Sequence, residues 1–139
     1  MAYDTNNVFA RILRGEIPSH KVFEDDHTLA FMDVMPQVDG HTLVIPRTAA
    51  ENLFDLPPEA LAATILTTQR VARAVRKAFA APGIMIAQLN GSEAGQSVFH
   101  VHFHVIPRSG GINLRLHARD MADQKVLAEH AARVRAALE

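Results

Sequence analysis

The chain has 139 residues, of which 48% are hydrophobic and 21% charged, a composition typical of one folded globular domain and not of a disordered segment. Its formal net charge of −1 provides no overall field to attract nucleic acid or an anionic membrane. The absence of cysteine excludes disulfides, thiolate nucleophiles and cysteine-ligated metal sites. Neither a signal peptide nor an apolar run of about 18 residues is visible, so we expect a cytoplasmic protein without membrane or nucleic-acid partners.

The first half of the chain predicts one short helix and three strands. The predicted elements are a helix ending near Arg14, strands at residues 20–24, 28–33 and 41–45, and a loop at residues 34–40. Asn6 or Asn7 can cap the helix, and Gly15 can end it. Asp25, Asp26 and His27 have the composition of a turn, so the first two strands are expected to form a hairpin.

The second half predicts two long helices and two strands. The predicted elements are a helix from Pro57 or Pro58 to about Ala81, a strand at residues 84–90, a loop at residues 91–97, a strand at residues 98–106, a loop beginning at Ser109, and a helix at residues 120–139. The apolar face expected on the first helix consists of Leu61, Ile65, Ala72, Val75 and Phe79. Because helices and strands do not alternate strictly, we predict a single α+β domain with an antiparallel sheet.

Histidine is the most informative residue type in this sequence. Three of the eight histidines, His100, His102 and His104, fall within five residues. Side chains of a strand alternate between its faces, so a strand at residues 98–106 would place all three imidazoles on one face. The apolar residues between them, Phe99, Val101, Phe103 and Val105, are then expected in the core. Of the other five histidines, His41 is a candidate site residue. The remaining four, His20, His27, His117 and His130, are expected at the surface.

Such a row of imidazoles has three possible interpretations. It can be a polar sheet surface, although such surfaces usually also contain Thr, Lys, Glu and Arg. It can be a metal site, because neighbouring histidines of the row would be about 6.6 Å apart and could share one zinc ion. The outer pair would be about 13 Å apart, so a two-histidine site would need a third ligand, such as His41 or Asp33.

The third interpretation is catalysis by a histidine nucleophile. A largely neutral imidazole is nucleophilic near pH 7, and a flanking histidine can orient it or protonate a leaving group. His102, at the centre of the row, has a potential helper on each side. The preceding loop at residues 91–97 contains two glycines and Ser97, whose backbone N–H groups and hydroxyl suit phosphate oxygens. This combination favours nucleophilic chemistry on a phosphate.

These residues resemble the signature of the histidine triad (HIT) family. The segment His100-Val101-His102-Phe103-His104-Val105-Ile106 is similar to the triad itself. Four further stretches also resemble the family, namely Gly15-Glu16-Ile17-Pro18, Phe23-Glu24-Asp25-Asp26, Leu29-Ala30-Phe31-Met32-Asp33 and His41-Thr42-Leu43-Val44-Ile45-Pro46. The resemblance implies a five-stranded antiparallel sheet with two main helices, a homodimer, and a bacterial type with a C-terminal extension from about residue 108 that carries a helix.

The resemblance also implies a role for each matching residue. His102 would attack the α-phosphate of a nucleotide, and His100 would orient it. His104 and Ser97 would contact the phosphate and assist the leaving amine, with His41 nearby. The implied nucleotide-binding residues are Asp33 for the ribose, Asn90, Gly95 and Gln96 for the phosphate, and Val8, Phe9, Ile12, Ile17, Phe31 and Val34 for the base.

The implied activity is hydrolysis of purine nucleoside 5′-phosphoramidates, of the AMP-amine or AMP-lysine type, without a metal or other cofactor. Some relatives carry an N-terminal Cys-x-x-Cys that contributes to a zinc site, but the corresponding stretch here, Asn7 to Ala10, has no thiol. Two alternatives stay open: cleavage of dinucleoside polyphosphates or other nucleotidyl anhydrides, and nucleotide binding or scaffolding with weak catalysis. The sequence does not distinguish adenine from guanine.

Overall fold

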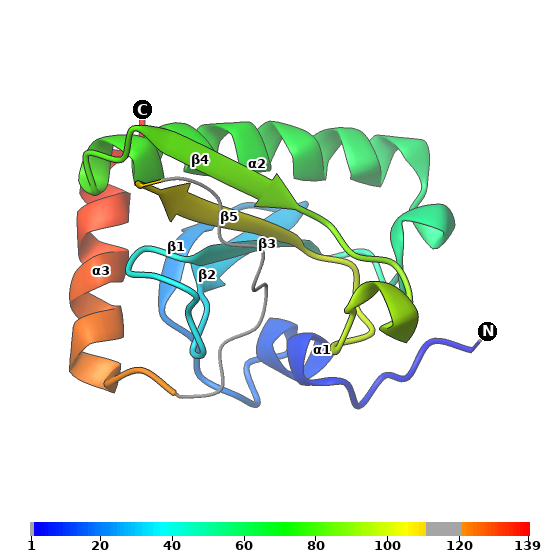
Figure 1. The fold of residues 1–139 in the computed structure, drawn as a ribbon. Coiled ribbons are helices and arrows are strands. Elements are labelled where there is room, and N and C mark those ends of the chain that lie inside the picture. The colour runs from blue at the N-terminus through cyan, green and yellow to red at the C-terminus, as the bar shows by residue number, and fades with distance from the viewer. Residues whose placement is uncertain (1, 111–120) are drawn as a thin grey trace.

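A computed structural model describes residues 2–110 and 121–139 (Figure 1). The strands are β1 (Lys21–Glu24), β2 (Thr28–Met32), β3 (Thr42–Pro46), β4 (Gly83–Ala87) and β5 (Phe103–Arg108). The helices are α1 (Val8–Leu13), α2 (Pro58–Ala78) and α3 (Gln124–Ala137), with short 3₁₀ turns η1 (Leu53–Asp55) and η2 (Ser92–Ala94). Across the described residues no helix is long and apolar enough to cross a membrane.

The five strands form one antiparallel sheet in the order β1-β2-β3-β5-β4 (Figure 1). β1 and β4 are therefore its two edges. Helices α2 and α3 cover one face, where their apolar residues pack with Ala30, Val44 and Val105. Helix α1 covers the other face, where Phe9 and Ile12 pack with Phe31. The α+β fold class and the antiparallel sheet predicted from the sequence are confirmed.

The ends of α1 follow from residues that the sequence singled out. The Asn7 side chain accepts a hydrogen bond from the Ala10 N–H at 2.9 Å, as expected of a helix N-cap. Gly15 lies just after the helix with a φ of +78°, a conformation that glycine adopts without a steric penalty. The cap and the glycine thus set the length of a helix whose Phe9 and Ile12 are buried.

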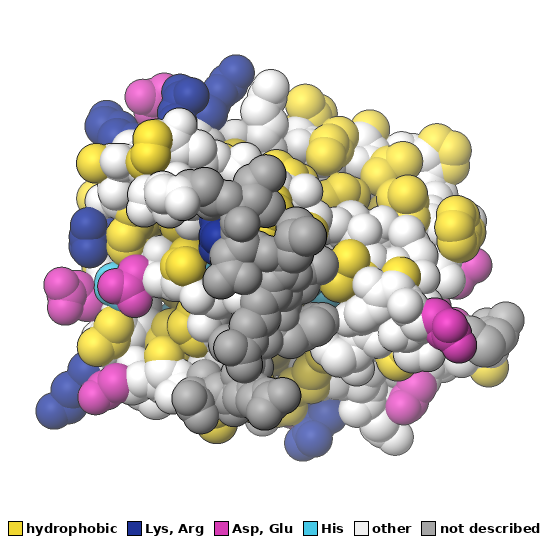
Figure 2. All heavy atoms as spheres, in the orientation of Figure 1, with side chains coloured by type: hydrophobic (Ala, Val, Ile, Leu, Met, Phe, Trp, Pro, Cys, Tyr) yellow, Lys and Arg dark blue, Asp and Glu magenta, His cyan; other side chains and the backbone are white. Residues whose placement is uncertain are grey.

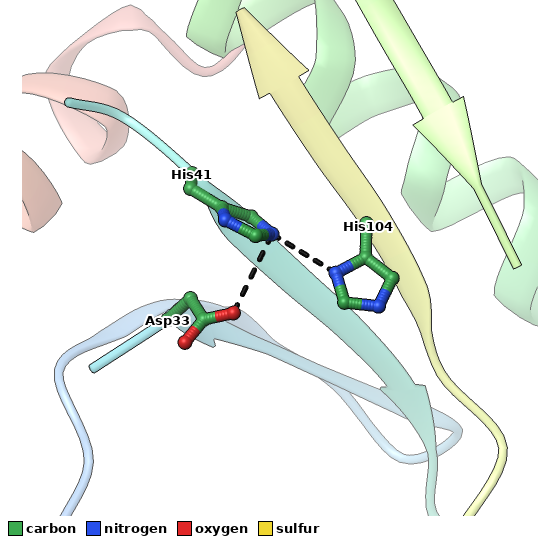
Figure 3. Close-up of side chains that lie close together, drawn as sticks. All are labelled: Asp33, His41 and His104. Carbon is green, nitrogen blue, oxygen red and sulfur yellow. Dashed lines mark hydrogen bonds and ion pairs between the residues drawn. The ribbon is translucent and has the colours of Figure 1, made fainter. Parts of the chain in front are cut away.

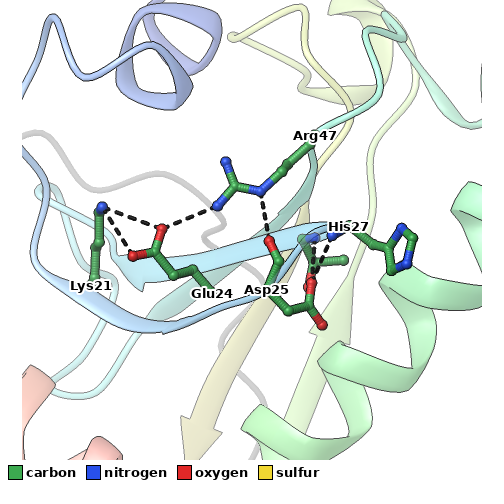
Figure 4. A network of polar contacts seen from close by, with 6 residues as sticks. Lys21, Glu24, Asp25, His27 and Arg47 are labelled. Carbon is green, nitrogen blue, oxygen red and sulfur yellow. Dashed lines mark hydrogen bonds and ion pairs between the residues drawn. The ribbon is translucent and has the colours of Figure 1, made fainter.

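The predicted β1–β2 hairpin is confirmed, and one carboxylate organises its turn (Figure 4). Asp25 Oδ1 accepts hydrogen bonds from the N–H groups of His27 and Thr28, each at 2.8 Å. Burial alone would raise the pKa of the Asp25 carboxyl, but these hydrogen bonds outweigh it and lower the pKa. Arg47 then joins β3 to the turn by donating to the Asp25 carbonyl and to the Glu24 carboxylate.

The buried face of α2 is made mainly of threonine and valine, and here one prediction is wrong. Ile65, predicted on the apolar face, is 45% exposed, whereas Thr64, Thr67 and Thr68 are buried. The Thr64 and Thr68 hydroxyls donate to carbonyls one turn earlier, and Thr67 hydrogen-bonds Thr28 of β2. Because these hydroxyls are satisfied inside the protein, hydropathy alone misjudged which side of the helix faces the sheet.

The ends of α2 and α3 also differ from the prediction. α2 ends at Ala78, because Ala80 takes a φ of +47°, and α3 begins at Gln124 behind the Asp123 cap. His130, expected at the surface, is buried against the Phe79 ring, with ring centroids 5.1 Å apart. Its burial was missed because it depends on how α3 packs on α2. The expectations for His117 and for a helix start at Asp120 fall outside the described residues.

The strand predicted at residues 98–106 is wrong in its first half, since β5 begins only at Phe103. The reason is that the preceding backbone has other partners. The Val101 N–H donates to the Ala50 carbonyl, and the His100 carbonyl accepts from the His102 side chain. Neither group is then available to a sheet ladder. Phe99, expected in the core, lines a surface cavity instead.

Candidate active site

A row of side chains across three strands forms the floor of the candidate site. Phe31 of β2 pairs with Leu43 of β3, and Leu43 pairs with His104 of β5. Since paired residues point to the same face, all three side chains lie on the α1 side of the sheet. Phe9 of α1 packs edge-on against Phe31, at a ring-centroid distance of 5.4 Å. A cavity of about 300 Å³ lies between this row and α1.

Most of the predicted nucleotide site lines this cavity. The predicted residues found there are Val8, Phe9, Ile12, Ile17, Phe31, Asp33, Val34, Ser97, His102 and His104. The apolar members surround one part of it, while the polar ones come from the end of β2, the loop before β5 and β5 itself. Of the predicted residues, His41, Asn90, Gly95, Gln96 and His100 do not line the cavity. Two of them contact cavity residues directly, since the side chain of His41 meets those of Asp33 and His104, and the carbonyl of His100 meets the side chain of His102.

His102 is held in a single tautomer by the backbone. Its Nδ1 lies 2.7 Å from the carbonyl oxygen of His100. A carbonyl can only accept, so Nδ1 carries the proton, and neutral His102 has its lone pair on Nε2. The ring makes a T-shaped contact with the Phe9 ring at a centroid distance of 4.9 Å. The imidazole is therefore oriented by groups at its back and side, and its Nε2 has the electronic form that a nucleophile needs.

His100 is completely buried and holds that carbonyl in place. Its Nε2 donates to the Pro46 carbonyl at 2.8 Å, so Nδ1 is the acceptor for the Tyr3 hydroxyl. Burial lowers the pKa of His100, and the hydrogen bond to Pro46 offsets only part of that effect. His100 is thus a neutral, fully hydrogen-bonded residue whose carbonyl contacts His102, and the orienting role implied by the resemblance stays a prediction.

His41 and His104 form a buried pair with a defined direction (Figure 3). The Gln37 N–H donates to His41 Nδ1 at 3.0 Å, so neutral His41 carries its proton on Nε2. That Nε2 lies 2.9 Å from His104 Nδ1, which must therefore accept. Neutral His104 is then protonated on Nε2. His102 and His104 thus have opposite tautomers, one suited to attack and the other to donation.

Asp33 lies beside this pair, directly after β2. Its Oδ2 is 3.4 Å from His41 Nε2, and its Oδ1 accepts from the Met35 N–H at 2.8 Å. The Asp33 N–H in turn donates to the His41 carbonyl, which ties the two residues together at one end of the β2–β3 pair. The carboxylate lines the cavity, so it is accessible to a ligand while it contacts the histidine pair.

The loop between β4 and β5 is shaped by the two predicted amides. Gln96 accepts from the Gly91 N–H and donates to the carbonyls of Glu51 and Val98. Asn90 accepts from the Leu53 N–H and pairs with Gln88. Both side chains thus hold backbone segments together, and Ser97 follows directly at the cavity wall. A contribution of Asn90, Gly95 or Gln96 to phosphate binding stays a prediction.

Three of these side chains also have the spacing of a metal site. The candidate ligand atoms of Asp33, His41 and His104 lie within 4.8 Å of one another. A metal on His41 Nε2 would, however, move the proton of neutral His41 to Nδ1, where it would face the Gln37 N–H. Two donors would then oppose each other at 3.0 Å. The hydrogen-bond pattern of these residues therefore does not fit a metal ion.

Several residues of the site were not singled out from the sequence. The additional cavity residues are Pro18, Ser19, Met32, Met35, Leu43 and Val98. Leu43 could have been found, because strand pairing places it between Phe31 and His104. Tyr3 could not, because it is 97 residues away from His100 in the chain and nothing in its local sequence signals the contact.

The sheet presents two differently oriented imidazoles at a pocket with an apolar part, and comparison with known proteins identifies the class of fold. The HIT domain family model matches residues 14–111, which is more than half of the chain. The chain belongs to the histidine triad (HIT) family.

Three solved structures are similar over nearly the whole chain. A Hit-like protein involved in cell-cycle regulation from Bartonella henselae is 48% identical, with a TM-score of 0.94, over 99% of this chain and 100% of that one. A zinc-bound histidine triad protein from Mycobacterium smegmatis is 39% identical, with a TM-score of 0.82, over 96% and 93%. A hypothetical histidine triad nucleotide-binding protein from Sulfolobus tokodaii is 28% identical, with a TM-score of 0.85, over 93% and 89%.

Proposed function

We propose that this protein hydrolyses purine nucleoside 5′-phosphoramidates in two steps through a nucleotidyl-histidine. In the first step, His102 Nε2 bonds to the α-phosphorus while the bond from phosphorus to the leaving nitrogen breaks. In the second, water attacks the phosphorus and the bond to Nε2 breaks, which releases the nucleoside monophosphate. No metal is needed in this scheme, since imidazole, hydroxyl and backbone donors meet the phosphate charge.

The observation that carries this proposal is the hydrogen bond from His102 Nδ1 to the His100 carbonyl. It leaves the lone pair on the nitrogen that has to attack, and it stabilises the imidazole when the new bond makes the ring positive. A histidine kept only for packing would not need this tautomer inside a cavity. His104 and Ser97 line the same cavity and supply the N–H and O–H donors for the phosphoryl oxygens and the leaving amine.

The two parts of the cavity suit the two parts of a nucleotide. The apolar part, with Phe9 and Phe31, suits the flat face of a purine, and the Asp33 carboxylate at the cavity wall can accept hydrogen bonds from ribose hydroxyls. The polar part contains His102, His104 and Ser97. A purine monophosphate therefore fits with its base under α1 and its phosphate at the histidines.

The test is hydrolysis of adenosine 5′-phosphoramidate in excess EDTA by the native chain and by His102→Ala. We expect EDTA-resistant turnover that falls at least about 1000-fold in the variant, with AMP binding largely retained. His27→Ala is the matched control, because His27 is exposed at the β1–β2 turn, and it should keep native activity. Full activity of His102→Ala would refute the assignment of the nucleophile.

The same experiment separates the alternative substrates. Faster cleavage of a dinucleoside polyphosphate would assign the same nucleophile to anhydride hydrolysis. AMP binding without turnover of either substrate class would instead identify a binding module. Activity that is lost in EDTA and restored by zinc would contradict the metal-independent scheme.

We also propose that two copies of the chain associate through β4 and α2. β4 is a sheet edge, and Ile86 on it is 43% exposed. Leu66 of α2 is 64% exposed and Phe54 of η1 is 82% exposed. Figure 2 shows hydrophobic side chains gathered over the part of the surface where α2 and β4 lie. An edge strand beside exposed apolar residues suits pairing with a second copy.

Light scattering tests the dimer, with Ile86→Lys as the disrupting variant and Val126→Lys, on α3, as the control. A native mass of one chain would refute it. The cytoplasmic location expected from the sequence stays a prediction, which fractionation of the producing cell would test.

A further inference from the structure

A second cavity, of about 360 Å³, adjoins the candidate active site. Val8, Ser97 and Val98 line both cavities, so the two share a wall. Ser97 is also the hydroxyl that the proposed function places beside the leaving amine. A leaving group larger than ammonia therefore has this second cavity directly next to it.

The second cavity contains two carboxylates and no basic side chain. Asp4 and Glu51 line it, and none of its described lining residues is Lys, Arg or His. Glu51 Oε2 is buried and has no hydrogen-bond partner within the described part of the chain. A carboxylate oxygen that is removed from water without a donor costs free energy, so a ligand that brings an N–H donor and a positive charge would be stabilised there.

Glu51 is tied to the backbone that leads into the histidine row. Its carbonyl accepts from Gln96 Nε2 at 2.7 Å. The preceding carbonyl, that of Ala50, accepts from the Val101 N–H at 2.9 Å. These two hydrogen bonds fix the residue on either side of Ser97 and the first histidine of the row. Its carboxylate thus has a defined place relative to the reacting centre.

The segment that carries Asp4 is tied to the same row from the other direction. The Tyr3 hydroxyl donates to His100 Nδ1 at 2.5 Å, and the Asp4 carboxylate accepts from the Asn6 N–H at 2.8 Å. Asp4 is exposed, whereas the Glu51 side chain is partly buried. The cavity therefore has one acidic group at its solvent side and one deeper group with an unpaired oxygen.

The rest of the wall suits a short methylene chain. Ala2, Val98 and Phe99 contribute apolar surface to the cavity. A ligand that combines methylene groups with a terminal ammonium would bury the former against this surface and place the latter at the carboxylates.

We propose, on the basis of the proposed function, that this cavity is a leaving-group subsite for aliphatic diamines and polyamines. One nitrogen of the amine is joined to phosphorus, and a second, positively charged nitrogen contacts Glu51 and Asp4. Lysine suits the subsite less well. A free lysine joined through its side-chain nitrogen brings a carboxylate along with its ammonium, and a lysine within a peptide brings no second charge.

The subsite acts on binding and leaves the chemical step as proposed above. His102 Nε2 bonds to phosphorus, and the phosphorus–nitrogen bond breaks with its electron pair on nitrogen. That nitrogen takes a proton from the His104 and Ser97 donors and leaves as an amine, while the distal ammonium keeps its charge throughout. Because the contact with Glu51 is the same before and during the attack, the preference should appear in KM and not in kcat.

The kinetic test compares adenosine 5′-phosphoramidates of three amines with the same methylene chain. 1,4-Diaminobutane ends in an ammonium, 1-aminopentane in a methyl group and 5-aminopentanoate in a carboxylate. For the native chain we expect kcat/KM to be about 10-fold higher for the diamine conjugate than for the pentylamine conjugate, and lowest for the carboxylate conjugate.

The possible failures of this test are distinguishable. Equal kcat/KM for the diamine and pentylamine conjugates would overturn the inference and leave the hydrolase proposal intact. Turnover of unsubstituted adenosine 5′-phosphoramidate alone would do the same, because it would exclude larger leaving groups. No turnover of any of the four substrates would refute the proposed function and this inference with it.

Substitutions test whether the preference comes from this cavity. Glu51→Gln removes the charge and keeps the shape, and it should reduce the preference for the diamine to about 3-fold or less. Asp4→Asn should reduce it by a smaller factor, since Asp4 is exposed. The matched control is Glu129→Gln, an equal charge change at an exposed position of α3, which should keep the native preference. The preference is a ratio measured within one variant, so partial unfolding does not alter it. A native preference in Glu51→Gln would overturn the assignment.

Equilibrium binding tests the subsite without turnover. In His102→Ala the conjugates should stay intact, and calorimetric titration should give a Kd about 10-fold lower for the diamine conjugate than for the pentylamine conjugate. Salt at about 0.5 M should reduce this difference, because the contact is between charges. Equal Kd values at low salt would overturn the inference.

Discussion

The two faces of the sheet are built from the same strands but have different roles. On the α2 and α3 side, residues such as Val44, Val71 and Leu127 form a continuous, fully buried core. On the α1 side, the alternate residues of the same strands support a six-residue helix and leave a cavity. We call the α2 and α3 side the closed face and the α1 side the open face. The closed face contributes most of the buried apolar area, and the open face carries the candidate reactive side chains.

This difference between the two faces explains how the protein tolerates polar side chains in its interior. His104 lies on β5, and Asp33, His41 and His102 lie directly beside the ends of β2, β3 and β5, strands whose other face is covered by two long helices. Three polar side chains of the candidate site are also held by a backbone partner: His41 by Gln37, His100 by Pro46 and Asp33 by Met35. Stability and reactivity are therefore separable by substitution.

The largest expected effect is on stability and comes from the closed face. Leu127 of α3 is 1% exposed, and Leu127→Ala should lower the free energy of unfolding by about 2–5 kcal/mol, because it leaves a cavity in the core. The kcat per folded molecule should stay native. Urea unfolding together with activity at low denaturant measures both. A loss of kcat at full folding would show that the two faces are coupled.

The next effect concerns the link between the two faces. Gly40 precedes His41 with a φ of +93°, and a Cβ there would lie 2.8 Å from the Phe79 ring at the end of α2. Gly40→Ala should cost about 2 kcal/mol through backbone strain and this clash. It should also disturb His41, so both Tm and kcat should fall. Calorimetry and kinetics on one preparation test this, and Gly91→Ala, which also has a positive φ but no nearby atoms, isolates the clash.

The pH dependence of stability should carry the signature of His100. The unfolded chain protonates this residue near pH 6.5, whereas burial lowers the pKa in the folded chain. The unfolded state then binds more protons below pH 6.5, so the free energy of unfolding should fall as the pH drops from that value, with no contribution above it. Urea unfolding at pH 7.5 and 5.5 measures this. In His100→Asn the difference should shrink, and an unchanged difference would assign it to other groups.

The smallest effect comes from the rim of the open face. Val8 lines the cavity and is 39% exposed. Val8→Ala should weaken AMP binding about 3-fold through lost apolar contact, while stability changes by less than about 0.5 kcal/mol. Calorimetric titration with AMP and thermal unfolding provide the two values. A larger loss of stability than of affinity would mean that Val8 belongs to the core and not to the binding surface.

The sequence predicted the parts of this protein whose signals are local. The Asn7 cap, the Asp25 turn and the spacing of the triad histidines each depend on residues a few positions apart, and the first two are confirmed by hydrogen bonds. Prediction failed where a segment distant in the sequence determines the hydrogen bonds or the burial of a residue. Residues 98–102 do not form a strand because Ala50 and the His102 side chain take up their hydrogen bonds. Likewise, His130 is buried because α3 packs on α2.

The sequence by itself therefore determined the α+β class, the order of the elements and the chemical types present at the site, because periodicity and turn chemistry act over short stretches. Only the tertiary structure decided which nitrogen of each imidazole carries the proton. That choice depends on the Gln37 amide, the His100 carbonyl and the Pro46 carbonyl, and strand pairing and chain folding bring these groups to the rings. His102 and His104 are the same residue type two positions apart, and their opposite tautomers come from their different hydrogen-bond partners.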